Sequence, residues 1–126
     1  MKALVVDDSR SMRAIISKQL RELGFTVEEA ASGQEALAKL HSGESIDIVL
    51  LDWNMPEMDG CEVLSLIRSQ PRYKKMRVMM VTTESEMSQV AVALEAGANE
   101  YLMKPFDRES LLEKLVLLGM DPAGRH

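Results

Sequence analysis

The 126-residue chain has almost no cysteine, since Cys61 is its single thiol. One cysteine excludes an internal disulfide framework and favours a reducing compartment, so we expect a cytoplasmic protein. Long apolar runs are also missing, because the longest, Val90–Leu94, has five residues. We therefore expect neither a membrane span nor a secretory signal segment.

Positive charge is not in excess either. Fifteen Lys and Arg stand against twenty Asp and Glu, which gives a net charge of -5. This balance opposes nucleic-acid binding, and we interpret the one basic cluster, residues 72–77, as a solvated loop. The length fits a single domain, which we expect over residues 1–120, followed by a short flexible tail over residues 121–126.

Short apolar runs alternate with longer stretches whose apolar residues recur every three or four positions. This alternation predicts five βα units around a parallel sheet. Most runs have the near-continuous Val, Leu, Ile and Met content of strands buried on both faces, whereas the more polar second run is predicted as an edge strand. The predicted strands are Lys2–Val6, Thr26–Ala30, Ile46–Leu51, Val78–Thr82 and Glu100–Met103.

Capping residues mark the ends of the helices predicted between these strands. The first helix should end at Gly24, which can adopt a left-handed conformation, and the third should end before Pro71. The fifth should run up to Gly119. The other helices are expected to open at Ser32 with Glu35 (second), Asp59 or Gly60 (third), Thr83 with Glu86 (fourth) and Asp107 (fifth).

Five such units most often adopt a flavodoxin-like fold. This is a doubly wound (βα)5 sheet of the α/β class, with strand order 2-1-3-4-5 and helices on both faces. Ligands of such sheets bind beyond the carboxyl ends of the strands. Five polar side chains fall at these ends and are expected to converge on one rim, namely Asp7, Asp8, Asp52, Thr82 and Lys104.

Three of these side chains are carboxylates, and each close pair would cost about 4 kcal/mol at an effective dielectric constant near 20. One lysine cannot neutralise three acids, so either a carboxylate stays protonated or a hard cation binds. Mg²⁺ is favoured because it accepts carboxylates, a carbonyl and waters. A carboxylate beside it can form an aspartyl phosphate, with Lys104 and Thr82 stabilising the phosphoryl charge.

No other nucleophile competes for this role. Cys61 falls within the predicted third helix, where we interpret it as core filler. His41 lies near the end of the predicted second helix and His126 in the tail, so neither should reach the rim. The residues alone leave open which of the three acids reacts.

Four ordered motifs carry a resemblance to a known family: Val5–Ser9, Leu50–Gly60, Val81–Thr82 and Tyr101–Phe106. Through them, residues 2–118 resemble the bacterial two-component response-regulator receiver family, and most closely its single-domain chemotaxis regulators. The resemblance implies that Asp52 accepts a phosphoryl group from the phosphohistidine of a histidine kinase. It also implies a Mg²⁺ site formed by Asp8, Asp52 and the Asn54 main-chain carbonyl, with Asp7 acting through water.

The same resemblance implies a switch. Phosphorylation would add about two negative charges to an already acidic site, so Lys104 and Thr82 would be drawn toward the phosphoryl group. Tyr101 would turn inward as Thr82 shifts, and the Lys104–Pro105 bond would be cis.

We expect the output face to be built from the fourth helix, the fifth strand and the fifth helix, with Val90, Tyr101 and Lys114 as candidate contacts. Asn54 and Glu84 resemble the pair that governs attack of water on the acyl phosphate in this family, so they should tune its lifetime. Thr83 departs from the family, in which Ala or Gly is frequent, and we expect its branched side chain to narrow access to the rim.

The implied partners are a sensor histidine kinase as phosphodonor, a phosphatase, and an output protein such as a flagellar switch component. Because the chain ends after the fifth helix, we expect no DNA-binding output domain. Chemotaxis is the leading interpretation, and a phosphorelay intermediate or another diffusible regulator are the alternatives. We expect a monomer that binds neither nucleic acid nor membrane.

Two other protein classes fit the pattern less well. A Mg²⁺-dependent phosphohydrolase that forms an aspartyl phosphate would need a cap insertion and an Asp-x-Asp spacing, and the run Asp8-Ser9-Arg10 lacks that spacing. A flavin-binding electron carrier would need a neutral phosphate loop where this chain places two acids. We expect a phosphoacceptor that catalyses its own phosphorylation and dephosphorylation rather than a conventional enzyme.

Overall fold

The computed structural model describes residues 1–124, apart from the side chain of Glu84. Its strands are β1 (Lys2–Val6), β2 (Thr26–Ala30), β3 (Ile48–Asp52), β4 (Arg77–Thr82) and β5 (Glu100–Met103). They form one parallel sheet in the order β2-β1-β3-β4-β5. The predicted α/β fold class and strand order are therefore confirmed, and β2 is an edge strand as its polar sequence predicted.

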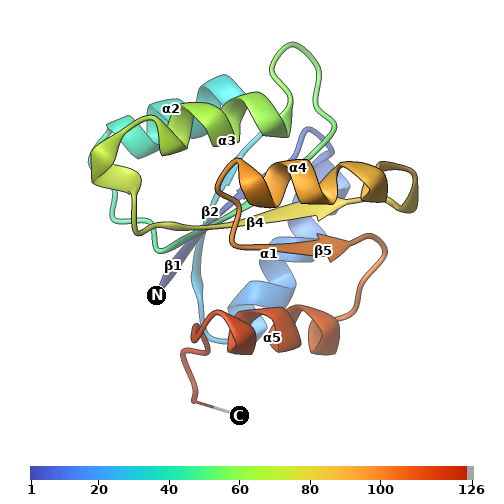
Figure 1. Ribbon diagram of the computed structural model, residues 1–126. Coiled ribbons are helices and arrows are strands. Elements are labelled where there is room, and N and C mark those ends of the chain that lie inside the picture. Colours follow the sequence, from blue (N-terminus) through green and yellow to red (C-terminus); the bar gives the residue numbers. More distant parts are fainter. Residues whose placement is uncertain (125–126) are drawn as a thin grey trace.

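Helices cover both faces of this sheet, which gives the doubly wound (βα)5 arrangement. The helices are α1 (Arg10–Glu22), α2 (Gly33–His41), α3 (Gly60–Arg68), α4 (Val90–Glu95) and α5 (Arg108–Leu117), with 3-10 segments η1 (Pro71–Tyr73) and η2 (Glu84–Gln89). Figure 1 shows α2, α3 and α4 on one face of the strands and α1 and α5 on the other. No helix in the described part of the chain combines the length and apolarity needed to cross a membrane.

Side chains of the central strands alternate between two apolar layers, because neighbours along a strand point to opposite faces. On β1, Leu4 and Val6 join the layer beneath α2, α3 and α4, whereas Ala3 and Val5 join the layer beneath α1 and α5. All five residues of β3 are buried. This two-sided packing fixes the carboxyl ends of the strands at one edge of the sheet.

Side-chain caps begin the helices where the sequence predicts them. The Ser32 hydroxyl accepts a hydrogen bond from the Glu35 N–H at 3.1 Å, and the carboxylates of Asp59 and Asp107 cap α3 and α5 in the same way. Gly24 has the expected left-handed conformation, with a φ of 106° just beyond α1. These boundaries follow from local hydrogen bonding, which is why short sequence patterns reveal them.

The prediction that Thr83 and Glu86 open the fourth α-helix is wrong. The capping box forms, with the Thr83 N–H 2.9 Å from Glu86 Oε1, but it opens η2, and the α-helix begins only at Val90. Ser85 and Ser88 lie in this stretch, and the Ser85 hydroxyl is 2.9 Å from that of Thr83. Short polar side chains compete for local hydrogen bonds and weaken α-helix formation.

The basic cluster at residues 72–77 is only partly a solvated loop. Tyr73 and Met76 are buried within it, and Arg77 already belongs to β4. β3 likewise begins at Ile48 rather than Ile46, and just before it the Lys2 N–H donates to the side-chain Oδ2 of Asp47 in place of a backbone carbonyl.

Neither Cys61 nor His41, the described residues set aside as nucleophiles, joins the group formed by Asp7, Asp8 and Asp52. Cys61 is on α3, partly buried against the apolar layer, and His41 is exposed at the end of α2.

Beyond α5, Asp121 is buried and accepts a hydrogen bond from the Ala123 N–H. The flexible tail over residues 121–126 stays a prediction, and His126 lies outside the described residues.

Candidate functional site

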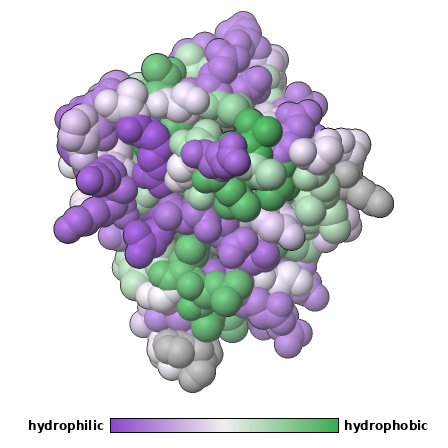
Figure 2. All heavy atoms as spheres, in the orientation of Figure 1, coloured by the Kyte–Doolittle hydropathy of each residue, from purple (hydrophilic) through white to green (hydrophobic). Residues whose placement is uncertain are grey.

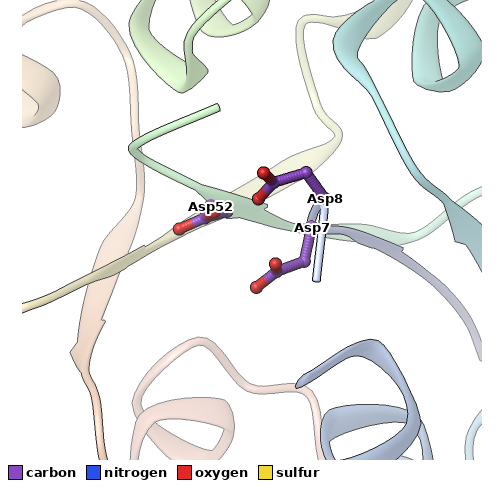
Figure 3. Close-up of side chains that lie close together, drawn as sticks. All are labelled: Asp7, Asp8 and Asp52. Atoms are coloured by element: carbon purple, nitrogen blue, oxygen red, sulfur yellow. The ribbon is translucent and has the colours of Figure 1, made fainter. Parts of the chain in front are cut away.

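The carboxyl ends of β1 and β3 bring three acids together. In the sheet register Val6 pairs with Leu51, so the next residues, Asp7 and Asp52, leave neighbouring strands side by side. Figure 3 shows the side chains of Asp7, Asp8 and Asp52 close together at the ends of these neighbouring strands. Carboxylate oxygens of the three residues all lie within 4.8 Å of one another.

The three acids differ in burial and in how they are held. Asp7 and Asp52 are buried, whereas Asp8 is exposed. Asp7 Oδ1 accepts a hydrogen bond from the Ser9 N–H at 2.8 Å, and its backbone carbonyl accepts one from Arg13 Nη1 at 2.7 Å. The turn between β1 and α1 is thus fixed from both sides, and the cluster opens to solvent at Asp8.

Lys104 reaches this cluster from the end of β5. Its Nζ donates to Asp7 Oδ2 and to Asp52 Oδ1, both at 3.1 Å, and its side chain is only 16% exposed. The Lys104 N–H also donates to the Thr82 carbonyl at 2.6 Å. The Lys104–Pro105 bond is cis, as predicted.

Burial and neighbouring charges shift the pKa of both Asp52 and Lys104. The pKa of Asp52 is raised from 3.8 to about 6, because burial and the charges of Asp7 and Asp8 raise it by more than the charge and hydrogen bond of Lys104 lower it. Burial lowers the pKa of Lys104, but the charges of Asp52 and Asp7 outweigh it, so the pKa is raised overall. The ammonium therefore stays protonated, and the cluster keeps an excess of negative charge.

This donor set fits a hard cation. Every candidate side-chain ligand is a carboxylate oxygen, which suits Mg²⁺, and the single ammonium of Lys104 cannot neutralise three carboxylates. Asp8 offers an exposed carboxylate where waters can complete the coordination. Asn54, whose main-chain carbonyl is the other predicted ligand, is an exposed residue of the segment that follows β3.

Close packing of the start of α3 against the end of β3 fixes the backbone of Asp52. A Cβ added to Gly60 would lie 2.4 Å from the Asp52 carbonyl oxygen, so only glycine allows α3 to begin this near to β3. The Gly60 N–H also donates to the Trp53 carbonyl at 2.9 Å. In the intervening segment Glu57 has a φ of 66°, a left-handed conformation that non-glycine residues seldom adopt.

Thr82 ends β4 next to this cluster, and it is fully buried. Its hydroxyl donates to the sulfur of Met87, with a distance of 3.6 Å between Thr82 Oγ1 and Met87 Sδ. The structure thus brings four of the five predicted rim residues into one interacting cluster, and the hydroxyl of the fifth is turned to a sulfur on η2.

Tyr101 and Lys114 are in direct contact on the predicted output face. Lys114 Nζ lies 4.1 Å from the centroid of the Tyr101 ring and 3.1 Å from Glu100 Oε1. A pocket of about 330 Å³ beside them is lined by Tyr101, Lys114 and Met87, among others. Val90, the third predicted contact, is only 8% exposed and offers little surface.

Exposed apolar side chains surround this face. Figure 2 shows apolar residues gathered over α4 and over α5 on the side in view. Val92 and Leu94 of α4 are 57% and 42% exposed, and Leu117 of α5 is 72% exposed. Apolar exposure of this kind is typical of surfaces that bind other proteins.

Sequence reasoning missed two residues that hold the site. Arg13 sits four positions after Ser9, the residue that caps α1, and this spacing on the first helical turn could have placed it beside Asp7. Met87 gave no such signal, because its position depends on η2 being a 3-10 segment. For Glu84, the other predicted lifetime residue, the side chain lies outside the described part of the chain.

Comparison with known proteins gives consistent matches. Residues 3–116 match the family model for the response regulator receiver domain. The chemotaxis protein CheY1 of Helicobacter pylori is 46% identical over 121 residues, which cover 94% of this chain and 98% of that protein. CheY of Pseudomonas aeruginosa is 47% identical over 116 residues, covering 91% and 93%. The solved structure of Vibrio cholerae chemotaxis protein CheY4 has a TM-score of 0.84 at 39% identity, covering 94% and 97%.

Proposed function

Because the chain belongs to the response regulator receiver family, we propose that it accepts a phosphoryl group on Asp52 from the phosphohistidine of a histidine kinase. The observation that carries this proposal is the acid cluster with its lysine. Three carboxylates lie within 4.8 Å of one another, and Lys104 contacts two of them. The excess negative charge suits Mg²⁺, and the ammonium is placed to bind phosphoryl oxygens.

Geometry favours Asp52 over the other acids as the acceptor. Asp7 uses both carboxylate oxygens, one for the Ser9 N–H and one for Lys104. Asp8 is exposed, where water competes for its carboxylate. Within the described residues, the Asp52 carboxylate accepts a hydrogen bond only at Oδ1, so Oδ2 is left to attack phosphorus.

The transfer then follows from the positions of these groups. Asp52 Oδ2 forms a bond to phosphorus while the bond between phosphorus and the imidazole nitrogen of the donor breaks, and the imidazole leaves with the electron pair. Bound Mg²⁺, held by Asp8, Asp52, the Asn54 carbonyl and, through water, Asp7, would neutralise charge on the phosphoryl oxygens. Lys104 stabilises the same oxygens with its ammonium group.

The new charge is the signal. A phosphoryl group brings about two negative charges to the rim, and the Thr82 hydroxyl turns toward one of its oxygens. Tyr101 turns inward in response and leaves its contact with Lys114. The face of α4, β5 and α5 thereby changes, and it binds the output protein through Tyr101, Lys114 and the apolar residues around them.

The names of the relatives point to the pathway. Those of H. pylori, P. aeruginosa and V. cholerae are chemotaxis proteins, so we infer that the output partner is a flagellar switch component. The chain would act as a cytoplasmic monomer, with a phosphatase resetting it. Asn54 and Glu84 would set the rate at which water hydrolyses the acyl phosphate.

Intact-mass measurement after incubation with acetyl phosphate and Mg²⁺ tests the proposal. Wild type should gain one phosphoryl group, and Asp52→Asn should gain none. Asp47→Asn, which changes an exposed acid before β3, should behave like wild type. If wild type never gains the group, or if Asp52→Asn gains it equally, Asp52 is not the acceptor.

A further inference from the structure

The buried hydroxyl of Thr82 has a partner outside the acid cluster. Thr82 is fully buried, so its hydroxyl cannot turn to bulk water. It donates to Met87 Sδ at 3.6 Å, within the range for a sulfur acceptor. A threonine hydroxyl carries one hydrogen, so it can donate to the sulfur or to a phosphoryl oxygen but not fully to both.

Resting on the proposed function, we propose that Met87 is a positioning residue for phosphorylation. Its sulfur holds the Thr82 hydroxyl in the unphosphorylated orientation, and this contact must break before Thr82 can bind the phosphoryl group. Met87 therefore opposes the switch until the charge at Asp52 is large enough to displace it.

The relative strengths of the two acceptors support this exchange. A thioether sulfur is a weak acceptor, whereas a hydrogen bond to a charged oxygen is roughly twice as strong as a neutral one. In the unphosphorylated protein the sulfur satisfies a hydroxyl that is shut off from solvent. Once the phosphoryl group is in place, its oxygen is the better partner and Thr82 turns.

The position of Met87 connects this exchange to the output face. Met87 lies on η2, and its side chain lines the same pocket as Tyr101 and Lys114. A 3-10 segment has poorer hydrogen-bond geometry than an α-helix, so it can rearrange more readily. When Thr82 releases the sulfur, Met87 is free to move within that pocket, into which Tyr101 can then turn.

Met87→Leu tests the proposal because it keeps an apolar side chain of similar volume and removes the sulfur. Met76→Leu, at a buried methionine before β4, is the matched control. The first measurement is the Thr82 side-chain rotamer in the unphosphorylated, Mg²⁺-free protein, from NMR couplings of its methyl group. We expect one dominant rotamer in wild type and Met76→Leu, and a mixture in Met87→Leu.

The second measurement is the affinity for beryllofluoride, a phosphoryl analogue, followed by Trp53 fluorescence with Mg²⁺ present. Met87→Leu should bind beryllofluoride about two- to ten-fold more tightly than wild type, because the variant lacks one neutral hydrogen bond that stabilises the unbound state of wild type. In a Thr82→Ala background the same substitution should change nothing, because the hydroxyl is already gone.

The outcomes separate the two proposals. An unchanged Thr82 rotamer in Met87→Leu overturns the role of Met87, and so does equally tighter binding in the Thr82→Ala background, which would mean that Met87 acts by packing alone. If wild type itself fails to bind beryllofluoride or to gain a phosphoryl group, the proposed function fails. The rotamer measurement still decides whether the sulfur holds Thr82.

Discussion

Asp52 is a buried carboxylate surrounded by like charges, and this placement affects stability as well as chemistry. Its pKa is about 6 in the folded protein against 3.8 for an unperturbed group, mainly through burial and the charge of Asp7. Between these values the folded state binds the proton more tightly than the unfolded chain. The contribution of Asp52 to stability is therefore greatest at low pH and is lost as pH rises through about 6.

Replacing Asp52 by Asn should remove the destabilisation that the buried, ionised Asp52 carboxylate causes above its pKa of about 6. We expect Asp52→Asn to raise the free energy of unfolding of the Mg²⁺-free protein near pH 7 by at most about 3 kcal/mol, with no gain near pH 4. Lys104 keeps its second partner, Asp7, so the ammonium is not left unpaired. Urea unfolding at several pH values measures the difference, with Glu95→Gln, at an exposed acid at the end of α4, as the control. A loss of stability near pH 7 would contradict the expectation.

Lys114 holds Tyr101 by a contact that can be tested separately. Its ammonium lies over the ring and also pairs with Glu100. Lys114→Gln should lower the free energy of unfolding by less than about 1 kcal/mol but release the ring. In protein labelled with 3-fluorotyrosine, the ¹⁹F resonance of Tyr101 should shift or broaden while that of Tyr73 does not. Glu109→Gln, at an exposed position of the same helix outside the Tyr101 pocket, should leave both resonances unchanged. An unmoved Tyr101 signal in Lys114→Gln would refute the contact.

Which residues could be predicted depends on how their positions are determined. Asp7, Asp52 and Lys104 follow predicted strands, and parallel strands bring their carboxyl ends to one edge whatever the details of the loops. The partner of the Thr82 hydroxyl could not be found this way. Met87 reaches it from η2, a 3-10 segment where the sequence predicts an α-helix.

At the scale of elements, the junction of β3 and α3 positions the acceptor. Gly60 lets the first turn of α3 approach the Asp52 carbonyl, and an added Cβ would lie 2.4 Å from that oxygen and 3.0 Å from Met80 Cε. The backbone oxygen cannot move without displacing the strand end. Any side chain at this position should therefore shift Asp52 relative to the other acids.

Gly60→Ala should accordingly lose both stability and phosphoacceptor activity. We expect a loss of about 1–3 kcal/mol in the free energy of unfolding, as in other overpacked sites, and slower transfer from acetyl phosphate in the fraction that stays folded. Glu62→Ala, on an exposed position of the same helical turn, provides the control. Wild-type stability and transfer in Gly60→Ala would show that the junction is not close-packed.

Element boundaries were predictable where one local hydrogen bond decides them. The caps at Ser32, Asp59 and Asp107 lie where expected because each depends on residues three positions apart. The start of β3 was not predictable from its own run. Just before β3, the Lys2 N–H donates to the side chain of Asp47 rather than to a backbone carbonyl, a contact with the neighbouring strand that the local sequence does not reveal.

For the whole molecule, the two apolar layers and the acid rim have opposite effects on stability. Packing of the layers favours the folded state, whereas repulsion among the carboxylates of the rim disfavours it. The layers hold the sheet rigid and close β1, β3 and β4 tightly together. That rigidity keeps three carboxylates near one another although they repel, so folding stability and the charge of the rim are coupled. A cation that binds among the acids should then stabilise the entire fold and not only the loops around it.

Thermal and urea unfolding with Mg²⁺ test this coupling. At about ten times its dissociation constant, Mg²⁺ should raise the free energy of unfolding of wild type by about 1.4 kcal/mol, because it binds only the folded state. Asp8→Asn and Asp52→Asn each lack a ligand and should gain much less, whereas Asp47→Asn should gain as much as wild type. Asp52→Asn has already lost the repulsion that the ionised Asp52 carboxylate causes among the acids. The free energy of unfolding of wild type with saturating Mg²⁺ should therefore approach that of Asp52→Asn. Equal gains in all four proteins would place the ion outside the acid cluster and separate the charge of the rim from the stability of the fold.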